Sequence, residues 1–281
     1  QVLAFTFIMI IQSIILGIVQ GLTEFLPVSS SGHLVIFKSY LGTDTQGVIW
    51  EVSLHFGTLL AIIGVFFKDI FEILRGVCLS CKKIVLGESL INIFRNDNNT
   101  RVFLLVLIGT IPTALIAFFF RSTFESLFNK PVLAGLMLLV TGTVLWFTRR
   151  YLIINSNKEK LGICDALIIG TVQGLAITPG ISRSGTTIAA AIFRGVDRGF
   201  AAKFSFLLAI PAILGAMAMV MKDPINFKND EISFLVTGSI VAAVTGYVSL
   251  RFLIKIITAG KLYLFSYYCW PVGLFAILFF L

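Results

Sequence analysis

The chain has 281 residues, of which 57% are apolar and 13% charged, and its mean hydropathy is +0.98. An ordinary soluble domain is less apolar and carries about twice the charged share, so composition excludes that class and predicts an integral membrane protein. The net charge of +8 would also suit a nucleic-acid-binding protein. The basic residues lie in loops between apolar runs, however, and we expect no nucleic acid partner.

Eight apolar segments follow one another along the chain. A discontinuous segment at 3–39 precedes runs at roughly 53–73, 102–120 and 131–148, and a second one at 163–196 precedes runs at 204–221, 232–253 and 262–281. The runs approach the ~20 residues that a helix needs to cross a bilayer. We therefore expect one all-α membrane domain over 1–281, with halves at about 1–150 and 151–281 that each contain three transmembrane helices.

The Lys and Arg residues are divided unequally between the two membrane faces. If each discontinuous segment enters and leaves on one face, the face of residues 40–52 receives five of the 22: Lys38, Arg121, Lys130, Lys222 and Lys228. Arg183 lies inside a motif, and the other sixteen fall on the opposite face. Because basic loops stay in the cytoplasm, both termini are predicted on the outer face.

Residues 17–32 and 170–185 form a repeat, identical at eight of sixteen positions. Both copies begin Gly-x-Val-Gln-Gly-Leu and end in a hydroxyl cluster, Ser29-Ser30-Ser31-Gly32 or Ser182-Arg183-Ser184-Gly185. Each half crosses the membrane an odd number of times, so the second half is predicted to be inverted. The sequence predicts an inverted-topology repeat with a re-entrant helical hairpin in each half, and a functional site where the interruptions meet.

Proline and glycine interrupt both repeated segments, at Pro27 and Gly32 and at Pro179 and Gly180. Such breaks are tolerated at membrane depth where protein or a watery cavity satisfies the freed backbone groups. The serines that precede new apolar helices are typical of helix N-termini, which bind anions. We expect these segments to line a cavity that accepts an anion.

Only the first copy contains a carboxylate and an imidazole. Glu24 follows Gln20 by four residues, so the two share a helix face. A carboxylate within the membrane is functional by default, and the alternative is a structural ion pair with Arg183. His33 follows Ser30 by three residues, a spacing that lets its ring reach the hydroxyl. His55, inside an apolar run, is expected to be a packing or hydrogen-bonding residue.

Only the second copy contains a guanidinium group, Arg183, between two serine hydroxyls. Its planar fork of donors suits phosphate oxygens. A serine beside a general base, with an arginine and hydroxyl donors for an anion, is typical of nucleophilic phosphoryl transfer. No Walker A lysine motif is present, which argues against nucleotide-driven chemistry.

At these residues the chain resembles the bacterial undecaprenyl-pyrophosphate phosphatases that confer bacitracin resistance. The family's first signature is Glu or Gln, then Glu four residues on, then Pro-Val-Ser-Ser-x-Gly-His, and it reads here as Gln20, Glu24 and residues 27–33. The second, Pro-Gly-x-Ser-Arg-Ser-x-x-Thr, reads as residues 179–187. Residues 204–211 also look like the family's, and the resemblance covers essentially the whole chain.

The resemblance implies a multi-pass enzyme of the bacterial cytoplasmic membrane that hydrolyses undecaprenyl pyrophosphate to the monophosphate and recycles the lipid carrier of peptidoglycan synthesis. The first discontinuous segment enters from the outer face by the charge count, so the site is expected to open outward. It implies Ser30 as nucleophile with Ser29 as rival, His33 as base and then acid, and Glu24 as metal ligand or proton-transfer residue. Arg183 would grip the pyrophosphate with the substrate-binding residues Gln20, Ser29, Ser31, Ser182, Ser184 and Thr187. A divalent Mg²⁺ or Ca²⁺ ion is implied at Glu24 and Gln20. Many members carry Glu at position 20, and an amide cannot supply a carboxylate's charge.

Two other functions fit parts of the sequence. An inverted-repeat transporter or flippase of a polyprenyl phosphate lipid would share the architecture, but it needs no nucleophile and base. A structural or bacitracin-sequestering membrane protein would leave Glu24 without a reason to lie in the bilayer. The sequence leaves a homodimer open.

Overall fold

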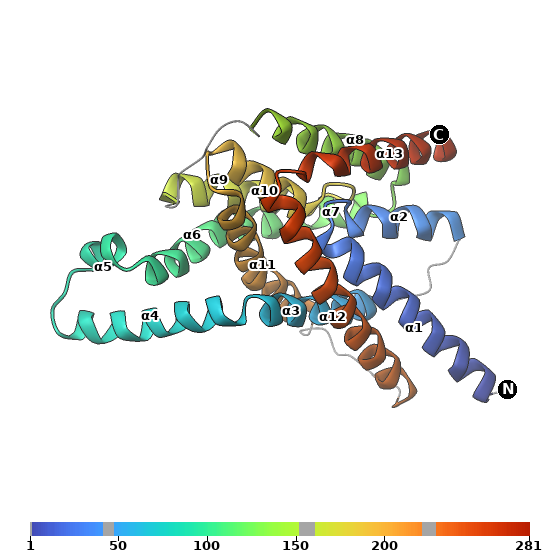
Figure 1. The fold of residues 1–281 in the computed structure, drawn as a ribbon. Coiled ribbons are helices and arrows are strands. Elements are labelled where there is room, and N and C mark those ends of the chain that lie inside the picture. The colour runs from blue at the N-terminus through green and yellow to red at the C-terminus, as the bar shows by residue number, and fades with distance from the viewer. Residues whose placement is uncertain (1, 42–47, 152–160, 221–228) are drawn as a thin grey trace.

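The computed structural model describes residues 2–41, 48–151, 161–220 and 229–281, and every element in these ranges is a helix (Figure 1). The helices of the first half are α1 (Val2–Phe25), α2 (Ser30–Leu41), α3 (Val48–Val65), α4 (Phe67–Val85), α5 (Leu90–Asn96), α6 (Asn98–Phe119), α7 (Arg121–Leu127), α8 (Pro131–Phe147) and the 3₁₀ helix η1 (Thr148–Tyr151). Those of the second half are α9 (Ile163–Leu175), α10 (Arg183–Phe193), α11 (Arg198–Val220), α12 (Asn229–Thr258), η2 (Leu262–Phe265) and α13 (Ser266–Phe280).

Five helical segments in the described residues are long and apolar enough to cross a membrane. They are Asn98–Phe119, Pro131–Tyr151, Arg198–Met219, Ile232–Thr258 and Leu262–Phe280. Large apolar side chains on three of them face outward, since Phe118, Val248 and Leu278 are 71%, 64% and 71% exposed. Exposed apolar surface on this scale needs lipid around it, and the chain is an integral membrane protein, as its composition predicted.

The sixth span expected from the sequence, 53–73, is not one continuous helix. Helix α3 ends at Val65, Phe66 leaves the helical region (φ −102°, ψ 20°), and α4 begins at Phe67. The reason is local, because Lys68 and Asp69 start an amphipathic helix in place of an apolar one. Figure 1 shows α4 continuing from α3 to the end of the molecule where α5 lies.

Both discontinuous segments break where the sequence indicated, at Pro27 in the first and at Pro179 and Gly180 in the second, whereas Gly32 lies in the first turn of α2. Helix α1 ends at Phe25 and α2 begins at Ser30, whereas α9 ends at Leu175 and α10 begins at Arg183. The breaks lie against a shared core in which Phe25, Phe204 and Phe206 are fully buried. The rings of Phe25 and Phe206 meet edge to face with centroids 5.8 Å apart, so the core holds the first break in place.

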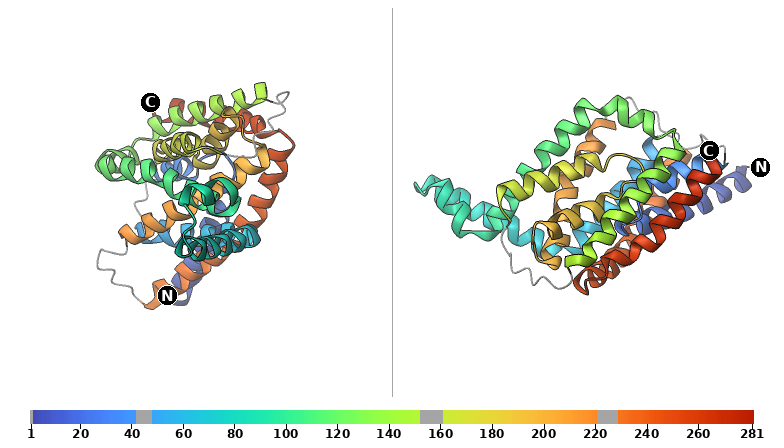
Figure 2. Two further views of the ribbon diagram at one scale, coloured as in Figure 1. Left: turned by 90° about the vertical axis from the view of Figure 1, so that its left-hand side faces the viewer. Right: turned by 90° about the horizontal axis from the view of Figure 1, so that it is seen from above.

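Helices of one half pack between helices of the other half. Helix α12 packs against α1 and α3, α6 packs against α9 and α11, and α8 packs against α13. Glycines permit the closest approaches: a Cβ atom on Gly17 of α1 would lie 2.7 Å from the Gly238 carbonyl oxygen of α12, and one on Gly170 of α9 would overlap the Gly109 carbonyl oxygen of α6. Figures 1 and 2 show the start of α1 and the end of α13 at one end of the molecule, opposite α4 and α5.

Replacing Gly170 with alanine is expected to lower the free energy of unfolding of the detergent-solubilised protein by about 1–3 kcal/mol, because the added methyl group forces α6 and α9 apart. Gly215→Ala is the matched control. Gly215 lies in helix α11 with open space at its Cβ position, so alanine there leaves the thermal unfolding midpoint unchanged or raises it slightly through its better helix propensity. Equal midpoints for the two variants would contradict the packing assigned to α6 and α9.

Candidate active site

The first interrupted segment ends in a serine turn with an unusual backbone. Ser29 has φ +66°, a left-handed conformation that costs a residue other than glycine free energy. Its hydroxyl oxygen accepts a hydrogen bond from the backbone N–H of Gly32 at 3.2 Å, and lies 3.3 Å from the Ser31 hydroxyl. Ser29 thus takes the place of a cap before α2, and Ser30 is the first residue of the helix.

The second interrupted segment repeats these contacts at the start of α10. The Ser182 hydroxyl caps the N–H of Gly185 at 3.2 Å and lies 3.3 Å from the Ser184 hydroxyl. Here the left-handed residue is Gly180, with φ +95°. The hydroxyl clusters of the sequence repeat are therefore a repeat of hydrogen bonds, and each leaves a helix N-terminus with free N–H groups.

The two motifs meet through their backbones. A Cβ atom on Gly32 would lie 2.8 Å from the Cα atom of Gly180, and one on Gly185 would lie 2.8 Å from the Cβ atom of Pro27. The Ser184 hydroxyl also donates to the carbonyl oxygen of Phe25 at 3.0 Å. The glycines allow this approach because they have no side chain, and the approach brings the acid of one motif to the cation of the other.

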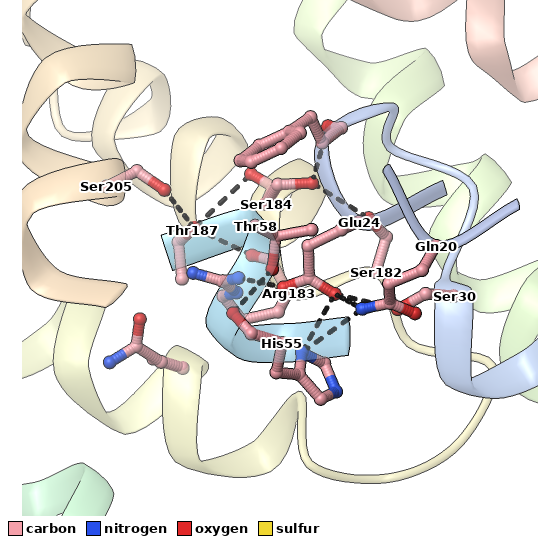
Figure 3. A network of polar contacts seen from close by, with 12 residues as sticks. Gln20, Glu24, Ser30, His55, Thr58, Ser182, Arg183, Ser184, Thr187 and Ser205 are labelled. Atoms are coloured by element: carbon pink, nitrogen blue, oxygen red, sulfur yellow. Dashed lines mark hydrogen bonds and ion pairs between the residues drawn. The ribbon is translucent and has the colours of Figure 1, made fainter. Parts of the chain in front are cut away.

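Glu24 is the centre of the polar network drawn in Figure 3. One carboxylate oxygen, Oε1, forms an ion pair with Nη2 of Arg183. The other, Oε2, accepts hydrogen bonds from Ser30 Oγ at 3.0 Å and from Gln20 Nε2 at 3.1 Å. Glu24 is only 8% exposed, so its charge depends on these three partners, which helices α10, α2 and α1 provide.

Ser30 and Ser29 occupy different positions in this network. The Ser30 hydroxyl donates to the carboxylate and is half-buried, whereas Ser29 is buried and its hydroxyl caps α2. A serine nucleophile needs a proton acceptor within about 2.6–3.2 Å, and Ser30 has one in Glu24. The geometry therefore supports Ser30 over Ser29 as the reacting serine.

Within the described residues, the His33 ring makes its hydrogen-bonding contacts with Ser29 and Tyr268, and none with the Ser30 hydroxyl that the sequence spacing lets it reach. Its ring atom Nδ1 lies 2.8 Å from the carbonyl oxygen of Ser29, and Nε2 lies 2.8 Å from the hydroxyl of Tyr268 on α13. The carbonyl only accepts, so Nδ1 carries the proton and, in the neutral ring, Nε2 accepts from Tyr268. The two rings also stack, with centroids 5.7 Å apart. In this structure His33 therefore stabilises the turn at Ser29, whose backbone is left-handed.

His55 of α3 joins the network instead. Its Nδ1 lies 3.1 Å from Gln20 Nε2 and 3.6 Å from Glu24 Oε2. The sequence identified it as a packing or hydrogen-bonding residue, and the structure places it within hydrogen-bonding distance of Gln20 and close to Glu24. Its only sequence signal is the cost of an imidazole within an apolar run.

Most of the hydroxyl groups predicted to bind substrate make internal contacts. Thr187 has no exposed surface, donates to the Arg183 carbonyl oxygen at 2.7 Å and lies 2.5 Å from the Ser205 hydroxyl of α11. Ser182 and Ser184 are also buried. These three side chains fix the turn that carries Arg183, whereas Ser30, Ser31 and Arg183 itself remain partly exposed.

The chain is similar to known proteins over almost its whole length. The family model described as bacitracin resistance protein BacA matches residues 13–275. The undecaprenyl-diphosphatase of Desulfatibacillum aliphaticivorans is 45% identical over 264 residues, which cover 94% of this chain and 96% of that protein. The undecaprenyl-diphosphatase of Alkaliphilus metalliredigens is 42% identical over 95% of this chain and 98% of that protein, and that of Halothermothrix orenii is 40% identical over 96% and 97%. With the match running through both serine motifs and nearly every helix, the chain belongs to the BacA family of bacitracin resistance proteins.

Proposed function

We propose that this protein hydrolyses undecaprenyl pyrophosphate to undecaprenyl phosphate, which recycles the lipid carrier of peptidoglycan synthesis and confers resistance to bacitracin. The observation that carries the proposal is the hydrogen bond from Ser30 to Glu24, whose other oxygen pairs with Arg183. A nucleophile, an acceptor for its proton and a cation for phosphate oxygens are the parts that phosphoryl transfer to a serine requires. The relatives' shared name, undecaprenyl-diphosphatase, gives the substrate.

The reaction follows from these contacts. Arriving pyrophosphate competes with Glu24 for Arg183, and the released carboxylate accepts the Ser30 proton as Oγ bonds to the terminal phosphorus. The bond from that phosphorus to the bridging oxygen breaks, and undecaprenyl phosphate leaves. Water then attacks phosphorus and displaces Oγ, and Glu24 returns the proton to Oγ. Inorganic phosphate departs as dihydrogen phosphate, which carries the oxygen and both hydrogens of the water.

This mechanism assigns the base role to Glu24 and gives His33 a positioning role. Both the ring Nδ1 and the backbone N–H of His33 contact the Ser29 carbonyl oxygen, at 2.8 and 3.2 Å. They hold the residue that precedes the nucleophile in its left-handed conformation. The sequence expected His33 to be the base, but that role requires its ring to leave both Ser29 and Tyr268.

The function is tested by phosphate release from farnesyl or undecaprenyl pyrophosphate by purified protein in detergent, with and without EDTA. We expect one inorganic phosphate for each prenyl monophosphate formed. A transporter or flippase would move lipid between the leaflets of a proteoliposome without releasing phosphate, and that result would overturn the proposal. The hydrogen bond between Ser30 and Glu24 favours the phosphatase, because transport does not need a serine with a proton acceptor.

A divalent cation, Mg²⁺ or Ca²⁺, also belongs to the proposal. Gln20 turns its NH₂ group to Glu24 and His55, so its amide oxygen is left as an acceptor without a hydrogen-bond partner among the described residues. One carboxylate and one amide oxygen suit an ion that takes its other ligands from water and substrate phosphates. The described residues contain no cluster of three His, Cys, Asp or Glu side chains for a metal, so the site fits a cation that binds with the pyrophosphate. When bound, the cation would neutralise phosphate charge.

Gln20→Glu is expected to lower the metal concentration for half-maximal rate and to leave the saturated rate within a few fold, because a second carboxylate four residues from Glu24 can reach the same ion. Glu24→Gln is expected to abolish metal-dependent turnover. The measurement is phosphate release against Mg²⁺ and Ca²⁺ concentration. A Gln20→Glu enzyme with a higher pH optimum and no gain in metal affinity would instead show repulsion between the two carboxylates, and would contradict a shared ion.

We also propose that the two interrupted segments are re-entrant hairpins of an inverted repeat, with the site open to the outer face of the cytoplasmic membrane. The repeat is supported by the packing of α12 against helices of the first half and of α6 against helices of the second half. The start of α1 and the end of α13 lie at the same end of the molecule, which supports placing both termini on one face. An impermeant thiol reagent outside intact cells should label and inactivate Ser31→Cys. The exposed native Cys78 of α4 is the control and should react from the cytoplasmic face only. The reverse pattern would refute the orientation.

A further inference from the structure

His55 has its proton position fixed by its neighbours. Glu24 Oε2 only accepts, so the Gln20 group 3.1 Å away must be the amide NH₂. The same nitrogen lies 3.1 Å from His55 Nδ1, and an NH₂ group only donates. Nδ1 therefore accepts, and the neutral imidazole carries its proton on Nε2.

The Nε2–H group of His55 is a donor that the protein leaves free. Both contacts of the ring, to Gln20 and to Glu24, are made by Nδ1, and no hydrogen-bond partner for Nε2 lies in the described ranges. The His55 side chain is 36% exposed, whereas that of Glu24 is 6% exposed. Figure 3 shows the second ring nitrogen directed away from Glu24 and Gln20.

The imidazole ring that carries this donor lies beside the carboxylate that accepts from Ser30. Ser30 Oγ and His55 Nδ1 contact the same carboxylate oxygen, at 3.0 and 3.6 Å. Arg183 contacts the other oxygen, so the serine, the imidazole and the guanidinium surround one carboxylate. A diphosphate has non-bridging oxygens on two phosphorus atoms and can meet the cation and a second donor together. Hydrogen bonds to ionised phosphate oxygens are among the strong ones.

We propose that His55 is a pyrophosphate-binding residue, which donates its Nε2–H to a non-bridging oxygen of the substrate diphosphate, and that Gln20 sets the tautomer that makes this possible. The inference rests on the proposed function for its substrate. It also gives the amide at position 20 a role: a carboxylate there could not donate to Nδ1, and the imidazole would lose the partner that holds the proton on Nε2.

The test compares His55→Phe, which keeps a flat ring without a donor, with His55→Gln and His55→Asn. The glutamine amide reaches the position of Nε2, and the asparagine amide reaches that of Nδ1. We measure KM for farnesyl pyrophosphate and, by calorimetry, the Kd of inorganic pyrophosphate. His55→Phe and His55→Asn should raise both KM and Kd about tenfold, as the loss of one hydrogen bond to a charged group predicts, and should leave kcat within a few fold of the wild type. In His55→Gln, KM and Kd should stay within about threefold of the wild type. Leu60→Ala, at an exposed position on the same helix, is the control and should change neither.

Unchanged KM and Kd in His55→Phe would overturn the inference, as would a fall in kcat alone or an equal loss in the Gln and Asn variants. The calorimetric arm separates this inference from the function. If the wild type binds pyrophosphate and His55→Phe weakens that binding, the role of His55 stands even where no phosphate is released.

Discussion

Replacing Ser30 with alanine is expected to lower kcat/KM for farnesyl pyrophosphate at least about a thousandfold, because loss of a nucleophile removes the covalent step entirely. The variant should still bind inorganic pyrophosphate, since Arg183 and the two helix N-termini remain. Phosphate release and calorimetry on the same preparation check both statements. An acid-quenched wild-type reaction with ³²P-labelled substrate should yield label on Ser30.

Ser29→Ala and Ser29→Gly are the matched controls for Ser30. Both remove the cap on the Gly32 N–H, which costs about 1 kcal/mol of stability for alanine and only a few tenths of that for glycine. Glycine tolerates φ +66°, so Ser29→Gly should be the more stable of the two and keep most of its activity. If Ser29→Gly lost activity as completely as Ser30→Ala, the assignment of the nucleophile would be wrong.

Arg183→Ala and Arg183→Lys are both expected to lower kcat/KM by about 10²–10³-fold, the usual effect of removing a donor that stabilises transition-state charge. Lysine keeps the charge but lacks the planar fork that can hold two phosphate oxygens. A lysine variant near the wild-type rate would mean that Arg183 acts only as a distant charge. Arg121→Ala is the control, because Arg121 and Glu125 form an exposed ion pair at 2.8 Å whose loss should change neither rate nor stability measurably.

Arg183→Ala should also destabilise the fold, because it leaves the buried Glu24 carboxylate without its cation. A second substitution separates the two effects. Glu24→Gln removes the uncompensated charge, so the double variant Glu24→Gln/Arg183→Ala should recover the thermal midpoint lost in Arg183→Ala and remain inactive. Recovery of activity together with stability would show that the ion pair serves structure alone.

Several features of this protein could be predicted from the sequence because they depend on local composition. Apolar length predicted the membrane class and five of the spans, since a bilayer sets the length of a helix wherever it lies in the chain. Proline and glycine predicted the breaks near Pro27 and Gly180, since these residues act on the backbone at their own position. The apolar run at 53–73 is divided between α3 and α4 for a local reason too, because Lys68 and Asp69 begin the amphipathic α4.

The sequence repeat also indicated residues that lie together in the structure. Glu24 and Arg183 are unique to opposite copies of one motif, and the structure joins them in an ion pair. The four-residue spacing also predicted that Gln20 lies beside Glu24, because the α-helical period fixes which residues share a face.

Only the tertiary structure decided the direction of the side chains that depend on a third segment. His33 could reach Ser30 by spacing, but Tyr268, 235 positions away, provides a partner on the other side of its ring. His55 enters the network because α3 packs beside α1, which no local pattern records. The hydroxyl of Thr187, which the resemblance implied as a substrate ligand, lies against Ser205 because α11 packs beside α10. A hydrogen bond forms with whichever partner the packing of the helices brings within about 3 Å. The sequence by itself therefore determined the membrane class, the breaks and the motif residues. The packing of distant helices determined which atoms of those residues remain available for a substrate.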